Sequence, residues 1–292
     1  MIKQPILKTS LFTAMALIAF AANSVLCRLA LGVHQMDAGS FTVIRLLSGI
    51  IVLYIIVAMH AKQQRTQLHF KLTTNWLAAA MLFVYATAFS FAYISLDTAT
   101  GALILFGSVQ ITMIAYSIYT GNRLNIAEWI GLAMAFIGFT YLIYPNLNSP
   151  SAIGFLLMSI SGIAWGIYSI QGMHAKTALF DTAQNFIKTL PFIAILALIS
   201  LPQAQFNLQG TLLALLSGGI ASGIGYAIWY TALRGLSNSQ AAVIQLAVPV
   251  IAAIGGVLLV SEEMTLHLMI STVMVLGGIL IVISARSFIQ LK

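Results

Sequence analysis

The sequence is a succession of apolar runs of about 20 residues each, separated by short polar breaks. A helix of that length crosses the roughly 30 Å of hydrocarbon in a bilayer. Only 7% of the residues are charged, too few to cover a surface that faces water. The strands of a membrane barrel would alternate apolar and polar residues, whereas these runs are continuous. The pattern therefore predicts an all-α polytopic membrane protein.

We expect ten transmembrane helices, at residues 9–31, 39–60, 74–95, 99–119, 126–144, 152–173, 182–201, 210–233, 239–260 and 266–286. Basic residues gather at both termini and in every second break, as Lys3, Lys8, Lys62, Arg65, Lys71, Arg123, Lys176, Arg234, Arg286 and Lys292. Because positively charged loops stay in the cytoplasm, both termini are expected inside, in a multi-pass protein of the cell inner membrane. The net charge of +7 follows from this topology and does not indicate a nucleic-acid partner.

The first apolar run has an alternative interpretation. Lys3 and Lys8, followed by an apolar stretch that ends in Ala-Phe-Ala at residues 19–21, are also typical of a cleavable signal peptide. Cleavage would leave nine helices and would break the alternation of basic breaks. We therefore favour a first run that stays in the membrane.

The second half of the chain resembles the first. A shift of 140 positions lays residues 92–125 on residues 232–265, and a shift of 143 brings Arg45 onto Lys188. Each half holds an odd number of expected helices, so the second half must enter the membrane in the opposite sense. The sequence thus predicts two inverted five-helix repeats, residues 1–147 and 148–292. Carriers built in this way bind substrate between the repeats, near the middle of the bilayer.

Several short motifs resemble the ten-span EamA-domain branch of the drug/metabolite transporter (DMT) superfamily. They are FAANSVLCR at residues 20–28, WGIYS at residues 165–169, Arg45 in the second expected helix, and Pro249 followed by Glu262. The chain departs from the family pattern at Phe20, where Trp is usual. It departs again at Val109 and Asn122, which correspond to Pro249 and Glu262 of the second half. The resemblance covers essentially the whole chain as two EamA-like units. It implies a carrier whose cavity is lined by the first, third, fourth, sixth, eighth and ninth helices.

Three cations fall inside the expected helices: Arg28, Arg45 and Lys188. A charge within the bilayer is costly and therefore marks a functional candidate. Arg45 and Lys188, at matching places in the two halves, are candidates to attract the carboxylate of an amino acid or a similar anion. The alternative is that these cations reach toward lipid headgroups or bind the carbonyls of a broken helix. We favour that alternative for Arg28, which lies near the outer end of its helix.

The acidic residues all lie at the ends of expected helices or in breaks, as Asp37, Asp97, Glu128, Asp181, Glu262 and Glu263. No carboxylate is therefore expected at mid-membrane, which disfavours coupling to H⁺ or Na⁺ through a carboxylate. Facilitated movement, exchange, or a proton route through His174 stay open. We expect Glu262 and Glu263 to end the ninth helix at the outer surface in a capping role.

Polar and aromatic residues inside the expected helices form a shortlist for the substrate site: Asn23, Gln110, Trp165, Tyr168, Trp229 and Gln245. Ligand sites are mostly apolar and aromatic with a few polar groups, so this set suits a small amphipathic metabolite. Trp and Tyr also anchor helix ends at the membrane surface, and that role stays open for the aromatic members. Pro249 removes a backbone hydrogen bond and is expected to kink the ninth helix, which frees the carbonyl of Gln245. The Gln245 side chain then lines the cavity or bonds a neighbouring helix.

Small residues at 217–226 form a face that lets helices approach closely. Gly219 and Gly223 lie four positions apart, as do Gly218 and Ser222. We expect this face to pack inside the bundle, with a dimer contact as the alternative. The single cysteine, Cys27, is expected to be a small buried apolar residue.

The sequence predicts a secondary transporter that exports small organic metabolites such as amino acids, by alternating access around a mid-membrane cavity. Its partners are then a small-molecule substrate and the lipid bilayer, with the protein a monomer or a weak homodimer. No cofactor and no metal is expected. A multidrug or lipophilic-cation efflux carrier of the same fold is the alternative. A membrane receptor or an intramembrane enzyme is more distant, because the chain has no HExxH, paired-aspartate or Walker A motif.

Overall fold

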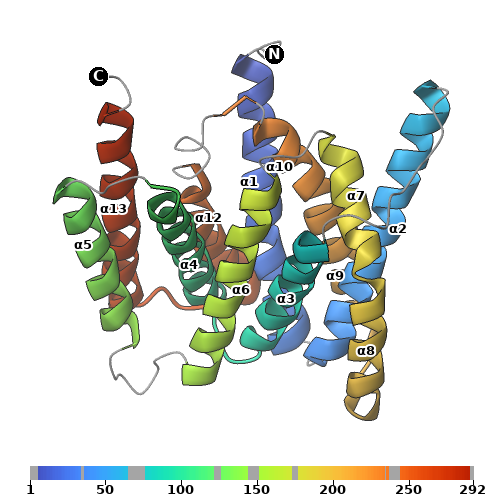
Figure 1. Ribbon diagram of the computed structural model, residues 1–292. Helices are drawn as coiled ribbons and strands as arrows, with labels where there is room; N and C mark the ends of the chain where they lie inside the picture. The colour runs from blue at the N-terminus through green and yellow to red at the C-terminus, as the bar shows by residue number, and fades with distance from the viewer. Residues whose placement is uncertain are drawn as a thin grey trace.

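The computed structural model describes residues 6–33, 36–64, 76–121, 126–143, 151–172, 177–233, 235–236 and 244–289, and most of this part of the chain is helical (Figure 1). The helices of the first half are α1 (Ile6–Arg28), the π-helical η1 (Leu29–Val33), α2 (Ala38–Gln64), α3 (Trp76–Ala92), α4 (Thr98–Tyr119) and α5 (Ile126–Ile143). Those of the second half are α6 (Ala152–Gly172), α7 (Ala178–Lys188), α8 (Leu190–Ser200), the 3-10 helix η2 (Leu201–Gln203), α9 (Leu208–Leu215), the π-helical η3 (Leu216–Ile224), α10 (Gly225–Leu233), α12 (Ala247–Gly255), the π-helical η4 (Gly256–Val260) and α13 (Leu266–Ile289).

The helices have the length and composition that a membrane requires. Within the described residues, six helical segments are long and apolar enough to cross one: Leu7–Gly32, Ala38–Gln63, Thr98–Tyr116, Ala152–Gly172, Ala178–Gln203 and Leu208–Leu233. Shorter apolar helices lie at Trp76–Ala92, Ile126–Gly138, Ala247–Val260 and Leu266–Ile281. Large apolar side chains such as Ile55, Phe136, Leu198 and Val273 are exposed on the outside, where a soluble protein would expose polar ones. The protein is thus a multi-pass helical membrane protein.

The expected seventh helix, residues 182–201, differs from the observed structure. Helix begins earlier, at Ala178, and is divided into α7 and α8 at Thr189. Pro191 explains the division, because it lacks a backbone N–H and its ring clashes with the preceding turn. Pro191 lies in the first turn of α8, where backbone N–H groups have no partner within the helix, so its missing N–H costs no helical hydrogen bond. Lys188 therefore ends α7 at a helix break.

The expected kink in the ninth helix appears as a break. Leu246 is a turn residue, and α12 begins at Ala247. Pro249 therefore lies in the first turn of α12, where its missing N–H removes no bond. Gln245 lies immediately before the break.

Successive helices run back and forth between the two ends of the bundle (Figure 1). The start of α1 and the end of α13 lie at the same end. The opposite end carries Arg28 at the close of α1, the start of α2 and the connection from η4 to α13. We call this the Arg28 end.

Helices of the first half pack mainly against helices of the second half. The partners are α5 with α13, α3 and α4 with α6, α1 with α10 and α12, α2 with η3, and α4 with α12. Much of the buried core therefore lies between the halves.

Glycines bring several of these helices into backbone contact. A Cβ on Gly218 of η3 would meet the backbone oxygen of Arg45 and the hydroxyl of Ser48 on α2. Gly219 lies against Val52 of α2, and Gly223 against Leu53. The expectation that this small-residue face packs inside the bundle is therefore confirmed.

Candidate functional site

The guanidinium of Arg45, on α2, is buried in the core, with 1% of the residue exposed. Its Nε donates to Ser222 Oγ at 3.2 Å, and Nη2 donates to the hydroxyls of Tyr85 at 3.1 Å and Tyr226 at 3.2 Å. The guanidinium also lies over the rings of Tyr85 and Phe89, at 5.3 and 4.8 Å from their centroids. Within the described residues, hydroxyl groups and ring faces thus take the place of a carboxylate partner.

Each hydroxyl that binds Arg45 has a further polar contact. The Tyr226 hydroxyl donates to the Tyr85 hydroxyl at 3.0 Å, and Ser222 Oγ donates to Asn23 Oδ1 at 3.3 Å. We call Asn23, Arg45, Tyr85, Ser222 and Tyr226 the Arg45 cluster. Its members come from α1, α2, α3, η3 and α10, so both halves of the chain build it.

The π-helical geometry of η3 helps to assemble this cluster. Ser217 and Ser222 both donate to Asn23 Oδ1, at 2.8 and 3.3 Å. In an α-helix, with 3.6 residues per turn, residues five apart point about 140° away from each other. A π-helix bonds residue i to i+5 and therefore brings such residues onto one face.

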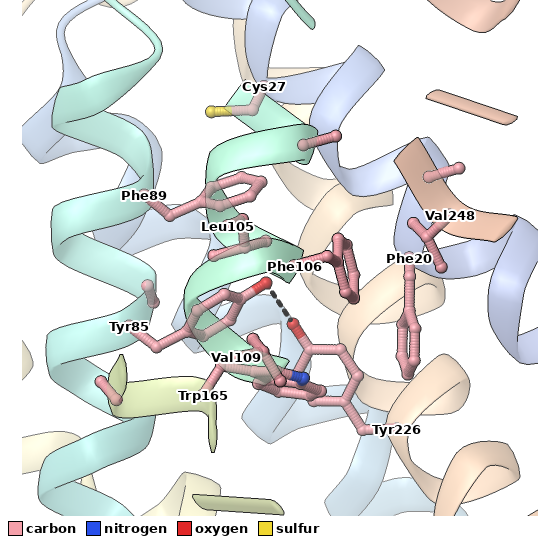
Figure 2. Close-up of a cluster of buried hydrophobic side chains, with 14 of the residues drawn as sticks. Phe20, Cys27, Tyr85, Phe89, Leu105, Phe106, Val109, Trp165, Tyr226 and Val248 are labelled. Carbon is pink, nitrogen blue, oxygen red and sulfur yellow. Dashed lines mark hydrogen bonds between the residues drawn. The ribbon is translucent and has the colours of Figure 1, made fainter. Parts of the chain in front are cut away.

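An aromatic shell packs against Tyr85 and Tyr226, the two tyrosines of the cluster (Figure 2). The Trp165 ring of α6 lies 4.8 Å from that of Tyr85, 4.7 Å from that of Tyr226 and 5.6 Å from that of Phe20. Phe20 in turn contacts the ring of Trp229 at 5.6 Å. Figure 2 shows the Tyr85 and Tyr226 hydroxyls pointing toward each other beside the Trp165 ring. The shell thus joins α1, α3, α6 and α10 around one polar centre.

Among the residues that the structure describes, four buried N–H groups in this region have no hydrogen-bond partner: Arg45 Nη1, Asn23 Nδ2, Trp165 Nε1 and Trp229 Nε1. An unsatisfied buried polar group costs about 1–3 kcal/mol. Native proteins tolerate few such groups, and each one calls for an explanation. Arg45 Nη1 and Asn23 Nδ2 belong to the Arg45 cluster, so acceptor atoms that a ligand brings there would satisfy these two groups.

The structure brings together five of the eight predicted site residues: Asn23, Arg45, Trp165, Tyr168 and Trp229. Tyr168 joins the group through the Trp165 ring, whose centroid lies 5.4 Å from its own. All five are buried, so anchoring of Trp165, Tyr168 and Trp229 at the membrane surface is wrong as an alternative. Their role in binding substrate stays a prediction.

The other three predicted residues are buried on different elements. Gln110 lies on α4, Gln245 precedes α12, and Lys188 lies at the break between α7 and α8. That break is the setting in which Lys188 can bind carbonyls of an interrupted helix. His174, the predicted proton route, lies outside the described residues.

The shortlist omitted two central residues, Tyr85 and Tyr226. They lie 141 positions apart, close to the shift that relates the two halves, and their hydroxyls meet at 3.0 Å. The signal that was available is therefore a pair of like residues at the spacing of the repeat. For Phe20 the signal is its place at the start of the FAANSVLCR motif, where the family usually has Trp. Ser222 has no comparable signal, because its spacing from Gly218 indicates helix packing.

The Arg28 end of the bundle is held by ion pairs. Arg28 Nε lies 3.2 Å from Glu262 Oε1, and Arg28 Nη2 lies 3.3 Å from Asp97 Oδ1. Glu262 also accepts from the backbone N–H of Thr98, at 2.9 and 3.0 Å, and from its hydroxyl at 3.0 Å. We call Arg28, Asp97, Thr98 and Glu262 the Arg28 network. It ties the ends of α1 and α4 to the connection that precedes α13.

Two predictions about these residues need correction. Glu262 does not cap its own helix at an open surface: it binds the start of α4, and its side chain is only 12% exposed. Arg28 pairs with acids from two distant connections and does not reach toward headgroups. Its Nη1 also donates to the backbone carbonyl of Tyr93, just past the end of α3, at 3.3 Å, in line with the expectation that it binds carbonyls at a helix end. Glu262 thus caps α4 and not the helix that it follows. The sequence does not predict these ion pairs, because partners so far apart cannot be inferred from local patterns.

The described residues contain no cluster of three or more His, Cys, Asp or Glu side chains placed to hold a metal ion. The buried cluster is instead made of an arginine, hydroxyls, an amide and indoles. A multi-pass helical protein with such a polar centre between its helices has the build of a membrane transporter.

Comparison with known proteins agrees with this class. The model of the EamA-like transporter family matches residues 152–284. An uncharacterized protein of Pseudomonas aeruginosa is 42% identical over 279 residues, which cover 96% of each chain. The uncharacterized transporter YoaV of Bacillus subtilis is 20% identical over 85% of this chain and 88% of its own. A probable amino-acid metabolite efflux pump of Escherichia coli is 25% identical over 66% of this chain and 71% of its own.

A solved crystal structure shares the fold, with a TM-score of 0.61, 20% identity, and coverage of 94% of this chain and 99% of the other. The chain belongs to the EamA-like transporter family, within the drug/metabolite transporter superfamily. These relationships point to a transporter and away from an enzyme.

Proposed function

We propose that the protein is a secondary transporter that exports small organic metabolites such as amino acids, by alternating access around the Arg45 cluster. One observation carries this proposal: a buried charge that lacks a carboxylate partner in the described residues lies where helices of both halves meet. A charge in that place is costly, and a substrate is a reason for it to be there.

We further propose ten membrane crossings arranged as two inverted repeats, residues 1–147 and 148–292. The helix contacts support this arrangement. If the repeats correspond, the counterparts are α1 and α6, α2 and α7, α3 and the segment η3–α10, and α4 and α12. Exchanging each helix for its counterpart converts the α3–α6 contact into α10–α1. The same exchange converts α4–α6 into α12–α1 and α2–η3 into α7–α3, and all of these contacts are present. The counterpart pairs α4–α12 and α5–α13 contact each other directly, as expected at a two-fold axis.

Alternating access requires that one end be closed while the other is open. The Arg28 network joins the two halves at the Arg28 end, and therefore supplies a closed end. With the basic termini in the cytoplasm of the inner membrane, the Arg28 end faces outward. An exporter binds its substrate from the cytoplasm while the Arg28 end is closed. It releases the substrate to the outside when the Arg28 network opens.

Amino acids are favoured as substrates because one relative is named as a probable amino-acid metabolite efflux pump. The alternative is a multidrug or lipophilic-cation carrier, since aromatic rings such as Trp165 and Trp229 also suit cations. A receptor or an intramembrane enzyme is more distant, because neither requires two oppositely oriented halves.

The proposal is tested by transport from liposomes. Purified protein is reconstituted into vesicles loaded with a broad metabolite panel, and the efflux of each solute is followed by mass spectrometry. We expect the wild type to move a subset of the panel that includes amino acids or related solutes. Trp165→Phe removes one unpartnered N–H and is expected to lower the flux about 2- to 10-fold, the usual effect of a single hydrogen bond.

Trp129→Phe is the matched control, because Trp129 lies on the outside of α5 with 62% exposed. It should leave the flux unchanged. Folded wild-type protein that moves no member of the panel contradicts the proposed function.

A further inference from the structure

We infer that the Arg45 cluster binds the carboxylate of an organic anion, and that an ammonium group on the ligand is dispensable. This inference rests on the proposed transport function, because it names the class of substrate that the same site takes. It also separates the two candidate classes, metabolite anions and lipophilic cations.

Four of the unpartnered groups in this region require a ligand atom that accepts hydrogen bonds, and the Tyr168 hydroxyl, which is also unpartnered, can both donate and accept. Arg45 Nη1, Asn23 Nδ2, Trp165 Nε1 and Trp229 Nε1 can donate hydrogen bonds, and none of them can accept one. A carboxylate offers two oxygens with about four acceptor positions. An ammonium offers only further donors, so it would leave all four groups unsatisfied.

The charge of the site favours the same choice. The described partners of Arg45 are the hydroxyls of Ser222, Tyr85 and Tyr226, which leave its positive charge in place. Asp97 and Glu262, at the Arg28 end, are paired with Arg28. A bound carboxylate would therefore be the counter-ion of Arg45. Each charge-assisted hydrogen bond then strengthens binding about 10- to 100-fold.

Aromatic rings alone would also suit a cation. The attraction of a cation to the rings can be compared with its repulsion by Arg45. A ring face strengthens the binding of a desolvated cation by about 30-fold or somewhat more. A second positive charge about 6 Å from Arg45 weakens binding by about 100-fold at an effective dielectric constant of ~20. This repulsion exceeds the attraction of one ring face, so the charge of Arg45 disfavours lipophilic cations at this site.

The rest of the ligand should be apolar and preferably flat. Phe20, Phe89, Trp165 and Trp229 are buried and contact one another or the two tyrosines edge-on or at a tilt. Such rings bind apolar and aromatic groups. The carboxylate thus orients the ligand at Arg45, and the apolar part of the ligand supplies contact area with the aromatic rings.

The experiment compares ligands that share a body and differ only in charge. Purified wild-type protein in detergent is tested by thermal shift with hydrocinnamate, phenylalanine, hydrocinnamamide and phenylpropylamine. A second series uses isocaproate, leucine, isocaproamide and isohexylamine. Because ligands that bind the native state raise its melting temperature, we expect both acids of each series to do so. The amide and the amine should bind at least about 10-fold more weakly.

Arg45→Met should weaken binding of both acids by at least about 10-fold. Lys62→Met is the matched control, because Lys62 is an exposed cation in the last turn of the same helix. It should leave the affinity unchanged. The wild-type series decides the question even if Arg45→Met fails to fold.

The inference is overturned if hydrocinnamate and isocaproate do not shift the melting temperature, or if an amide or amine matches its acid. Transport of panel solutes by the same preparation would then leave the proposed function standing. A folded preparation that neither binds the acids nor moves any solute would contradict both the inference and the proposed function.

Discussion

Replacing Arg45 with methionine is expected to reduce transport about 100-fold or more while the protein stays folded. Methionine keeps much of the length of the side chain but removes the charge and every donor. If a carboxylate binds there, the substrate loses its counter-ion and its charge-assisted hydrogen bonds. The loss should appear at every substrate concentration that the liposome assay reaches.

Stability separates this role from a purely structural one. After the substitution, the Tyr226 hydroxyl still bonds that of Tyr85, and Ser222 still bonds Asn23. No hydroxyl of the Arg45 cluster is left without a partner. Removing a buried charge that lacks a carboxylate partner also relieves its desolvation cost. The melting temperature without ligand should therefore fall by no more than about 2 °C, or should rise.

The check is a melting curve and a flux measurement on the same purified preparation. A structural role for Arg45 predicts a large drop in melting temperature that accounts for the lost transport. A stable variant with wild-type flux would instead show that Arg45 is not part of the transport site.

Glu262→Gln is expected to open the Arg28 end of the bundle. The substitution keeps the size of the side chain but removes the charge that pairs with Arg28 at 3.2 Å. The bonds from Thr98 to the carboxylate are weakened as well. Loss of such contacts to a partly buried charge costs about 1–3 kcal/mol, which shifts the balance toward the open state about 5- to 150-fold.

Cys27 reports this opening directly. It is the single cysteine of the chain, it is fully buried, and it directly precedes Arg28. A membrane-impermeant methanethiosulfonate reagent added outside intact cells should modify Cys27 at least about 5-fold faster in Glu262→Gln than in the wild type. The modified fraction is read by mass spectrometry after purification.

Glu263→Gln is the matched control, since Glu263 is the neighbouring acid and is exposed. It should leave the labelling rate of Cys27 unchanged. Equal rates in the wild type and Glu262→Gln would mean that the Arg28 network does not hold this end closed. Equal acceleration in both variants would point to a general effect of surface charge.

Much of the fold follows from the sequence because a bilayer demands long apolar helices. The expected helix at residues 99–119 is observed as Thr98–Tyr119, and that at 152–173 as Ala152–Gly172. Departures occur where the backbone is irregular. Pro191 divides the seventh segment, and η3 adopts π-helical geometry that a period of 3.6 residues does not predict.

The candidate site was predictable in its residue types and less so in its contacts. Arg45, Asn23 and Trp165 stood out because polar and charged groups are rare in apolar runs. The Tyr85–Tyr226 pair and the Arg28–Glu262 ion pair join residues 141 and 234 positions apart, so only the packed structure brings them together. The roles of Gln110, Gln245 and Lys188 at the site stay predictions.

Counterflow is the most direct test of one site that reorients between two sides of the membrane. Liposomes that contain the wild-type protein are loaded with unlabelled phenylalanine or hydrocinnamate and diluted into a trace of the same labelled compound. A reorienting carrier accumulates label transiently above its equilibrium level, and we expect this overshoot for the wild type and its absence for folded Arg45→Met. Label that only equilibrates with wild-type protein, or an equal overshoot in Arg45→Met, would contradict a reorienting site centred on Arg45.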